Sequence, residues 1–191
     1  MRKNQKLIDQ ANKLSSSELY DFLRDFNLNK LNNYQVEICH ATQLSNEYQK
    51  QIIELFEINM KQLYEQSAFG YNYDEKRDEL FSNQSRYLII SLANSVLGFA
   101  HFRFDMDFGK RVLYLYELQV NMKYQGQGFG QSMIEQLKIL CQKTQMSKVV
   151  LTVHKVNTKA IDFYMKKCQF EPDITDPSDE DVDYIILSFT V

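Results

Sequence analysis

The spacing of apolar side chains along the chain predicts both helices and strands. Apolar residues that recur every three or four positions indicate helices, whereas alternating or short continuous apolar runs indicate strands. Helices are predicted within the first 33 residues, from about Ser45, over 74–80, after Gly130 and from Asn157. Strands are predicted at 34–40, 86–92, 96–105, 111–120, 149–153 and 184–189. This mixture of the two kinds of element predicts an α/β fold.

The N-terminal segment, residues 1–33, is expected to be a helical appendage. Ser15 and Glu18 have the spacing of a capping box, in which the two side chains satisfy backbone amides at the start of a helix. An apolar stripe follows at Leu19, Phe22, Leu23 and Phe26. The stripe predicts that the segment packs on the main domain, which we place at residues 34–191.

The three middle strands are expected to form an antiparallel meander. Only Ala93-Asn94-Ser95 separates the first two strands, and Phe108-Gly109-Lys110 turns the chain into the third. Connections this short imply antiparallel neighbours.

The composition is that of one compact globular domain. The 191 residues are 44% hydrophobic and 25% charged, with a net charge of -3. This charge does not favour nucleic acid or a membrane as partner, and no apolar run approaches the roughly 20 residues that span a bilayer. The three cysteines are far apart and lack Cys-x-x-Cys spacing, which argues against a disulfide framework or a zinc site. We expect a soluble protein of a reducing compartment, without a metal.

A glycine-rich run follows the third meander strand. Residues 125–130 read Gln-Gly-Gln-Gly-Phe-Gly where a strand gives way to a helix, so their amides could converge on a phosphate. A P-loop would carry Lys and then Ser or Thr after its last glycine, and a dinucleotide fingerprint would read Gly-x-Gly-x-x-Gly. The run fits neither pattern. Taken alone, it could also be a flexible helix entry without chemical meaning.

Together with Asn157-x-x-Ala160-x-x-x-Tyr164, this run resembles the Gcn5-related N-acetyltransferase (GNAT) superfamily, whose members carry Arg/Gln-x-x-Gly-x-Gly/Ala there. The resemblance covers about residues 34–190. It implies a mixed central sheet splayed between two strands and flanked by helices, with acetyl-CoA as the co-substrate. The cofactor-binding residues that it implies are Leu118, Gln119, Val120, Gln125, Gly126, Gln127, Gly128, Phe129, Gly130, Gln131, Asn157 and Tyr164.

Several separated segments are similar to the NatD type of N-terminal acetyltransferase within this superfamily. They are residues 59–67, 101–105, 114–119, 144–146, 151–153 and 184–188. The resemblance implies acetylation of a basic protein tail, the Ser-Gly-Arg-Gly-Lys terminus of histones H-four and H-two-A, by a cytoplasmic and nuclear monomer. Phe69 and Tyr71 stand where this type often has tryptophan. The implied substrate-binding residues are Tyr64, Phe69, Asp105, Tyr114, Tyr116, Thr152 and Tyr184.

Two residues are expected to take part in the chemistry, Glu117 as base and Tyr164 as the acid that protonates the leaving thiolate. A backbone amide near Leu118 would polarise the thioester carbonyl. Strict alternation along the strand would set Glu117 among apolar residues, which raises the pKa of a carboxyl and suits it to act directly or through water. The opposite face would then carry Tyr114, Tyr116 and Leu118. A surface or salt-bridged glutamate is the structural alternative.

Other candidates also have structural alternatives. Asp105 could cap a turn, the tyrosines could belong to the core, and Thr152 could bond to a backbone carbonyl if buried. His40, His101 and His154 have no metal spacing and are expected to be structural. Acetylation of another peptide, an internal lysine or a small amine is an alternative activity. A non-catalytic acetyl-CoA-binding or peptide-binding module is the alternative from another class.

The stretch from Glu171 to Asp183 is strongly acidic, and neither lysine nor arginine occurs after Lys167. Such a loop could attract a basic tail and raise its rate of encounter. It could equally be a solvated loop. We expect some of these acids to meet Arg or Lys side chains of the substrate.

Overall fold

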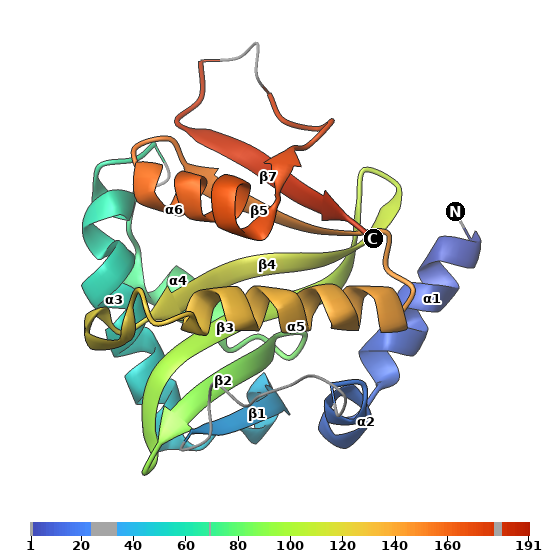
Figure 1. Cartoon of the computed structure of the whole chain (residues 1–191), viewed down its shortest axis with the longest axis horizontal. Coiled ribbons are helices and arrows are strands. Elements are labelled where there is room, and N and C mark those ends of the chain that lie inside the picture. The colour runs from blue at the N-terminus through green and yellow to red at the C-terminus, as the bar shows by residue number, and fades with distance from the viewer. Residues whose placement is uncertain (1, 24–33, 69, 178–180) are drawn as a thin grey trace.

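A mixed seven-stranded sheet forms the centre of the protein, in the strand order β1-β2-β3-β4-β5-β7-β6 (Figure 1). The computed structural model describes residues 2–23, 34–68, 70–177 and 181–191. Its strands are β1 (Gln35–His40), β2 (Arg86–Leu92), β3 (Ser95–Asp107), β4 (Lys110–Val120), β5 (Lys148–His154), β6 (Glu171–Pro172) and β7 (Tyr184–Thr190). Its helices are α1 (Arg2–Lys13), α2 (Ser16–Asp21), α3 (Asn46–Glu65), α4 (Tyr73–Leu80), α5 (Phe129–Lys143) and α6 (Thr158–Asp162). Short turns are η2 (Ala41–Gln43), η3 (Met122–Tyr124) and the π-helical η4 (Phe163–Lys167).

The strands predicted from the sequence are confirmed, each within two residues of its expected bounds. β2, β3 and β4 form the expected antiparallel meander, whereas β5 pairs with β4 in parallel. The predicted caps at Ser15, Ser45 and Asn157 all accept a hydrogen bond from the first turn of their helices. The short β6 and the π-helical turn were not predicted.

Helices cover both faces of the sheet (Figure 1). Leu88 of β2 packs in the core cluster that contains the apolar side chains of α5. Its neighbour Tyr87 points to the other face and belongs to a second core cluster, which contains Phe56 of α3. This alternation is the period of two expected for a strand buried on both sides.

β4 has one extra residue at the point where it lies opposite His101 and Phe102 of β3. Backbone pairing joins Phe102 to Leu115 and His101 to Glu117, so Tyr116 between them has no partner in β3. An insertion of this kind is a β-bulge, and it shifts the side-chain alternation by one position. Residues of β4 beyond Tyr116 therefore point to the faces opposite to those that strict alternation predicts.

The bulge overturns the predicted surroundings of Glu117. Leu118 packs in the same core cluster as Leu115, away from the tyrosines that were expected beside it. Glu117 turns to the other face of the sheet, where it meets Tyr64 and Lys76. The expectation of apolar neighbours for Glu117 is therefore wrong, because alternation was extended across an unrecognised bulge.

β4 and β5 separate part-way along their length. Their parallel pairing runs from Val112 with Lys148 to Leu115 with Leu151 and stops there. β4 nevertheless continues to Val120, and β5 continues for three residues. The expected splayed sheet is thus confirmed, and the separation lies directly after the last paired residues.

The N-terminal helices share the core of the main domain. Ile8 and Ala11 of α1, with Leu19 and Leu23 further on, belong to the same cluster as the side chains of α5. Asn12 also donates from Nδ2 to the carbonyl of Phe104 at 3.0 Å. The predicted packing of this segment is therefore extensive, although Phe26 lies outside the described residues.

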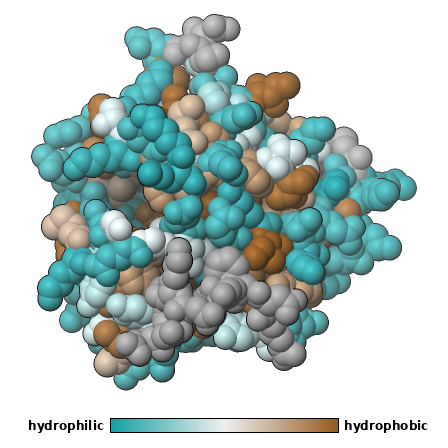
Figure 2. All heavy atoms as spheres, in the orientation of Figure 1, coloured by the Kyte–Doolittle hydropathy of each residue, from teal (hydrophilic) through white to brown (hydrophobic). Residues whose placement is uncertain are grey.

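The outer surface is largely polar on the face drawn in Figure 2, where apolar side chains are scattered and a hollow opens beneath α6. In the described part of the chain, none of the helices has the length and apolar character needed to cross a membrane.

Candidate active site

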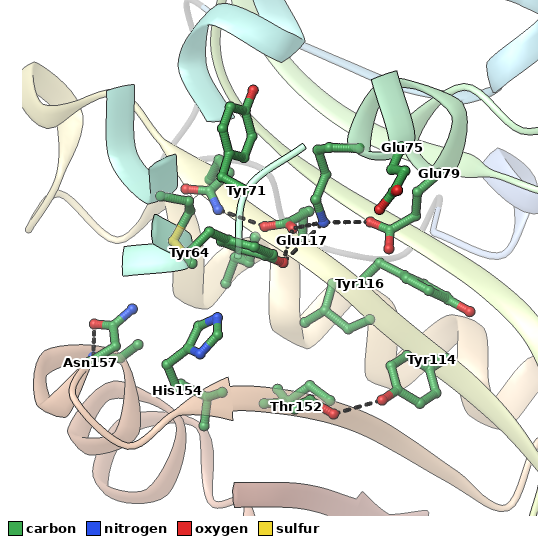
Figure 3. Close-up of a pocket in the computed structure, with 18 of the residues that line it drawn as sticks. Tyr64, Tyr71, Glu75, Glu79, Tyr114, Tyr116, Glu117, Thr152, His154 and Asn157 are labelled. Carbon is green, nitrogen blue, oxygen red and sulfur yellow. Dashed lines mark hydrogen bonds and ion pairs between the residues drawn. The ribbon is translucent and has the colours of Figure 1, made fainter. Parts of the chain in front are cut away.

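A pocket of about 390 Å³ opens where β4 and β5 separate. Its walls come from α3, α4, β4, β5 and the turn of α6 and η4 (Figure 3). Many residues that the sequence singled out line it together. They are Tyr64, Tyr114, Tyr116, Glu117, Leu118, Gln119, Thr152, Asn157 and Tyr164.

The carboxylate of Glu117 accepts hydrogen bonds on both oxygens (Figure 3). Lys76 Nζ donates to Oε1 at 3.1 Å and the Tyr64 hydroxyl donates to it at 3.3 Å, while Gln119 Nε2 donates to Oε2 at 2.8 Å. Asn59 of α3 in turn donates to Gln119 Oε1 at 3.0 Å. The Glu117 side chain, only 4% exposed, is therefore fixed by groups from α3, α4 and its own strand.

Burial and charge act in opposite directions on this carboxyl. Burial raises the pKa of Glu117, and the Lys76 ammonium and the Gln119 amide oppose the rise. Burial alone would lower the pKa of Lys76, but Glu117, Tyr64 and Glu79 outweigh it and raise that pKa. Lys76 is therefore charged at neutral pH and favours the carboxylate form of Glu117.

Tyrosines form the wall beside the gap between the strands. The hydroxyl of Tyr114 and Oγ1 of Thr152 lie 2.7 Å apart and share a hydrogen bond between β4 and β5. Thr152 is exposed, so its partner is a side chain at the pocket and not a backbone carbonyl in the core. The Tyr116 ring stacks on His101 at 5.0 Å between centroids and lies 4.4 Å from the Arg103 guanidinium carbon. Burial raises the pKa of both tyrosines, which keeps their hydroxyls protonated.

Tyr164 reaches the pocket from the π-helical turn η4. It is 8% exposed, and burial, together with Glu117 and Cys168, raises the pKa of its hydroxyl. The phenol therefore holds its proton at neutral pH and can donate it. Asn157, at the start of α6, accepts from the Ala160 amide at 3.3 Å through its side chain, as predicted.

An exposed glycine-rich loop leads into the first turn of α5. Gly126 and Gly128 have φ of 74° and 91°, a left-handed conformation that favours glycine. Gln125 and Gln127 donate from their side chains to backbone carbonyls at 3.0 and 2.9 Å, which holds the loop in shape. Gly128 precedes the helix and provides no side-chain cap. Amides at such a helix start have no partner within the helix and suit the diphosphate of a coenzyme.

Comparison with known proteins identifies the family. The sequence model of the Acetyltransferase (GNAT) family matches residues 50–170, well over half of the chain. The chain belongs to the GNAT acetyltransferase family. GNAT enzymes transfer an acetyl group from acetyl-CoA, so acetyl-CoA is the co-substrate and acetyl transfer is the class of reaction.

Solved structures share the GNAT fold with this protein at low sequence identity. PaiA N-acetyltransferase from Thermoplasma acidophilum, in complex with coenzyme A, has a TM-score of 0.58 at 20% identity, over 82% of this chain and 99% of that chain. Arabidopsis thaliana Naa50 in complex with the bisubstrate analogue CoA-Ac-MVNAL has a TM-score of 0.58 at 20% identity, over 83% and 99%. The NatC complex bound to Gag peptide and CoA has a TM-score of 0.61 at 13% identity, over 83% of this chain and 99% of that chain.

In this GNAT protein some predicted site residues lie away from the pocket. Asp105 is exposed near the end of β3 and accepts from the amide of its neighbour Met106 at 2.7 Å. Tyr184 lines a separate hollow with Ala68 at the start of β7. Phe69 lies outside the described residues. Val120 directly follows the pocket residue Gln119 in the sequence but does not line the pocket. Residues 125–131 do not line it either.

Three acids of the acidic segment after Lys167 bind to groups within the GNAT domain itself. Asp173 is buried and accepts from Lys148 Nζ at 2.6 Å. Asp176 accepts from the Ile186 amide and Asp183 from the Ala68 amide, both at 2.7 Å. These three acids shape the protein itself, so the expectation that the segment serves the substrate can hold only for the others.

Lys76 and Glu79 of α4 are among the pocket residues that sequence reasoning missed. Lys76 is 8% exposed and contacts Glu79 Oε1 at 2.6 Å. Their helix was predicted only as short and charged, without an inner face. The spacing of Lys76 to the buried Leu80, four residues on, would have placed the lysine on the inner face of the helix. His154 and Tyr71 also line the pocket without having been assigned to it.

The described residues contain no group of three or more His, Cys, Asp or Glu side chains placed to hold a metal ion. His101 is fully buried and its Nε2 lies 2.8 Å from Ser85 Oγ, so it is a structural histidine as expected.

Proposed function

We propose that this GNAT protein acetylates the α-amino group of polypeptides that begin Ser-Gly-Arg-Gly-Lys, the N terminus of histones H-four and H-two-A. The observation that carries the proposal is the buried carboxylate of Glu117 in a pocket walled by Tyr64, Tyr114 and Tyr116. The proposal includes a monomer that acts in the cytoplasm and nucleus.

The acceptor must lose a proton before it attacks. An α-amino group has a pKa of roughly 7.7 to 8.0, whereas a lysine side chain has about 10.4, so the α-amino group needs the weaker base. Both oxygens of Glu117 already accept hydrogen bonds from protein groups, which favours a bridging water over direct contact with the amine. The amine proton passes to that water, and a water proton passes to Glu117.

The transfer itself can be followed bond by bond. Acetyl-CoA supplies the thioester whose acetyl carbon the amine nitrogen attacks, forming the N–C bond as the C–S bond breaks. Tyr164 gives its proton to the departing sulfur. Beyond Leu115, β4 has no pairing with β5, so backbone groups near Leu118 are available to polarise the carbonyl oxygen.

A peptide acceptor suits the character of the walls. Tyrosine hydroxyls and Thr152 can form hydrogen bonds with the backbone of the first residues of a peptide. Glu75 and Glu79 of α4 favour a cationic side chain on the peptide residues that follow. The resemblance to NatD-type segments supports a serine terminus followed by arginine. Naa50 and the NatC complex, which share the fold, were solved with a peptide-containing analogue and a peptide.

The test is acetylation of a peptide library with mixed N termini, read by mass. We expect preferential acetylation of peptides that begin Ser-Gly-Arg-Gly-Lys and no product from the same peptide with a blocked α-amino group. Acetylation of the blocked peptide would instead identify an internal lysine as acceptor. Binding of acetyl-CoA without acetylation of any peptide or small amine would favour the non-catalytic alternative.

A further inference from the structure

Lys76 is a buried cation whose ammonium group has a hydrogen-bond acceptor for each of its protons. Its Nζ donates to Glu79 Oε1 at 2.6 Å, to the Tyr64 hydroxyl at 2.9 Å and to Glu117 Oε1 at 3.1 Å. An ammonium has three N–H donors, and three acceptors are present. The ring of Phe56 lies 4.9 Å from Nζ and adds a cation–π contact. All three protons are therefore committed, and the position of the ammonium is fixed.

The direction of the hydrogen bonds follows from Lys76. Because the Tyr64 oxygen accepts from the lysine, its own proton is free to point to Glu117 Oε1 at 3.3 Å. Gln119 donates to the other carboxylate oxygen. Glu117 thus meets three donors in this network, which is the pattern of a carboxylate and not of a neutral acid.

We infer that Lys76 is a positioning residue for acetyl transfer: its ammonium holds Glu117 in the carboxylate form and aligns the Tyr64 hydroxyl on it. The inference deepens the proposed function and rests on it in one respect, the use of Glu117 as base. Lys76 contacts neither acceptor nor acetyl group in this account and acts only through Glu117 and Tyr64.

Ionisable groups from several elements surround the network of Lys76 and Glu117. Tyr64 comes from α3, and Lys76 and Glu79 come from α4. Further ionisable groups close to the network include Tyr87 of β2, His101 and Arg103 of β3, Tyr114 and Tyr116 of β4, His154 of β5, Tyr164 of η4 and Glu75 of α4. In the described part of the chain, Lys76 is the lysine or arginine that forms an ion pair with Glu117. Burial and Glu79 oppose ionisation of Glu117, so loss of Lys76 should raise its pKa further.

The experiment follows the Glu117 carboxyl directly in Lys76→Met and Lys76→Arg. Protein labelled with carbon-13 at the glutamate carboxyl is titrated by NMR, and the Glu117 signal is assigned by its absence in Glu117→Gln. We expect the signal to titrate at higher pH in Lys76→Met than in the natural protein, and Lys76→Arg to restore the lower value. The turnover number of Lys76→Met at pH 7 should fall at least about tenfold and recover as pH rises.

Lys50→Met is the matched control, because Lys50 is exposed on α3 and forms an ion pair with Glu54 one helical turn away. It should leave the carboxyl titration, the turnover and the thermal midpoint unchanged. An unchanged Glu117 titration in Lys76→Met overturns the inference, whatever the activity. Absence of any N-terminal acetylation by the natural protein overturns the proposed function, while the NMR titration still decides the role of Lys76. If Lys76→Met does not fold, Lys76→Gln takes its place, and the Glu117 signal should again titrate at higher pH than in the natural protein.

Discussion

The Tyr114 hydroxyl and Thr152 Oγ1 lie 2.7 Å apart and join β4 to β5 next to the last backbone pair of these strands. Backbone pairing stops at Leu115 and Leu151, so this side-chain bond takes over where the sheet begins to open. Both residues line the pocket. One hydrogen bond thus links the stability of the opened sheet to the wall that a peptide would touch.

Removing either end of this bond should weaken the same interaction. We expect Tyr114→Phe and Thr152→Val each to lower the free energy of unfolding by about 0.5 to 1 kcal/mol. The double variant should lose clearly less than the sum of the two, because the single bond cannot be lost twice. Urea unfolding of the four proteins measures the coupling. Strict additivity would show that the two hydroxyls do not interact.

Glu117→Gln tests the base. The amide keeps the size of the side chain but cannot take up the amine proton, so we expect the turnover number to fall by about 100-fold at pH 7. Acetyl-CoA affinity should change little, because the backbone of β4 and the start of α5 provide the contacts expected for the coenzyme. Steady-state kinetics and calorimetric titration separate the two effects.

The control for this variant is Glu54→Gln, which removes the charge of an exposed glutamate on α3. It should keep full turnover. An active Glu117→Gln would remove Glu117 as the base and leave it with a structural role in the Lys76 network.

Gly128→Ala tests the loop before α5. Its φ of 91° is left-handed, so alanine should cost about 1 kcal/mol of stability and shift the loop. Gly109, in the turn between β3 and β4, has φ of 75° and lies away from the pocket lining. Gly109→Ala should show a similar loss of stability, but only Gly128→Ala should weaken CoA binding, by about tenfold. Equal CoA affinities, measured by calorimetry, would contradict a role for this loop.

Asp173→Asn tests the buried ion pair with Lys148. Removing one partner leaves the lysine buried with Asp107 at 3.7 Å, and we expect a loss of about 3 kcal/mol in the free energy of unfolding at pH 7. Asp162→Asn, which breaks an exposed pair with Lys166, should lose less than about 0.5 kcal/mol.

The pH dependence of this loss follows from the pKa of Asp173. Burial alone would raise that pKa, but hydrogen bonds from Lys148, Ser188 and Thr175 hold it well below the usual value of about 3.9. A carboxyl whose pKa is lower in the folded than in the unfolded state contributes its full stabilisation at pH values above the unfolded-state pKa. The difference in free energy of unfolding between the natural protein and Asp173→Asn should therefore be constant from pH 7 to 5 and shrink as pH falls below about 4. A difference that grows on acidification would contradict the assignment.

Local signals in the sequence predicted most of the fold. Ser45 and Asn157 were identified as helix caps because a cap depends on residues within one turn. The meander followed from its short connections. The chemical candidates Glu117 and Tyr164 came from resemblance, and the structure brings both to one pocket.

The rest could not be predicted because it depends on contacts between distant segments. The bulge at Tyr116 depends on how β3 and β4 pair, and it reversed the expected face of Glu117. Lys76 lies 41 residues before Glu117 along the chain, so no local spacing connects them. The acids after Lys167 were expected to face solvent or substrate, yet Asp173 is buried on a lysine from β5.

The shared packing of α1 and α2 with α5 bears on how the protein can be shortened. Ile8, Ala11, Leu19 and Leu23 close one side of the interior beneath the sheet. A fragment that starts at residue 34 would expose that side to water, and the resulting apolar surface could associate with other copies. Recombinant versions meant to stay monodisperse should therefore retain both leading helices, even though the pocket lies elsewhere.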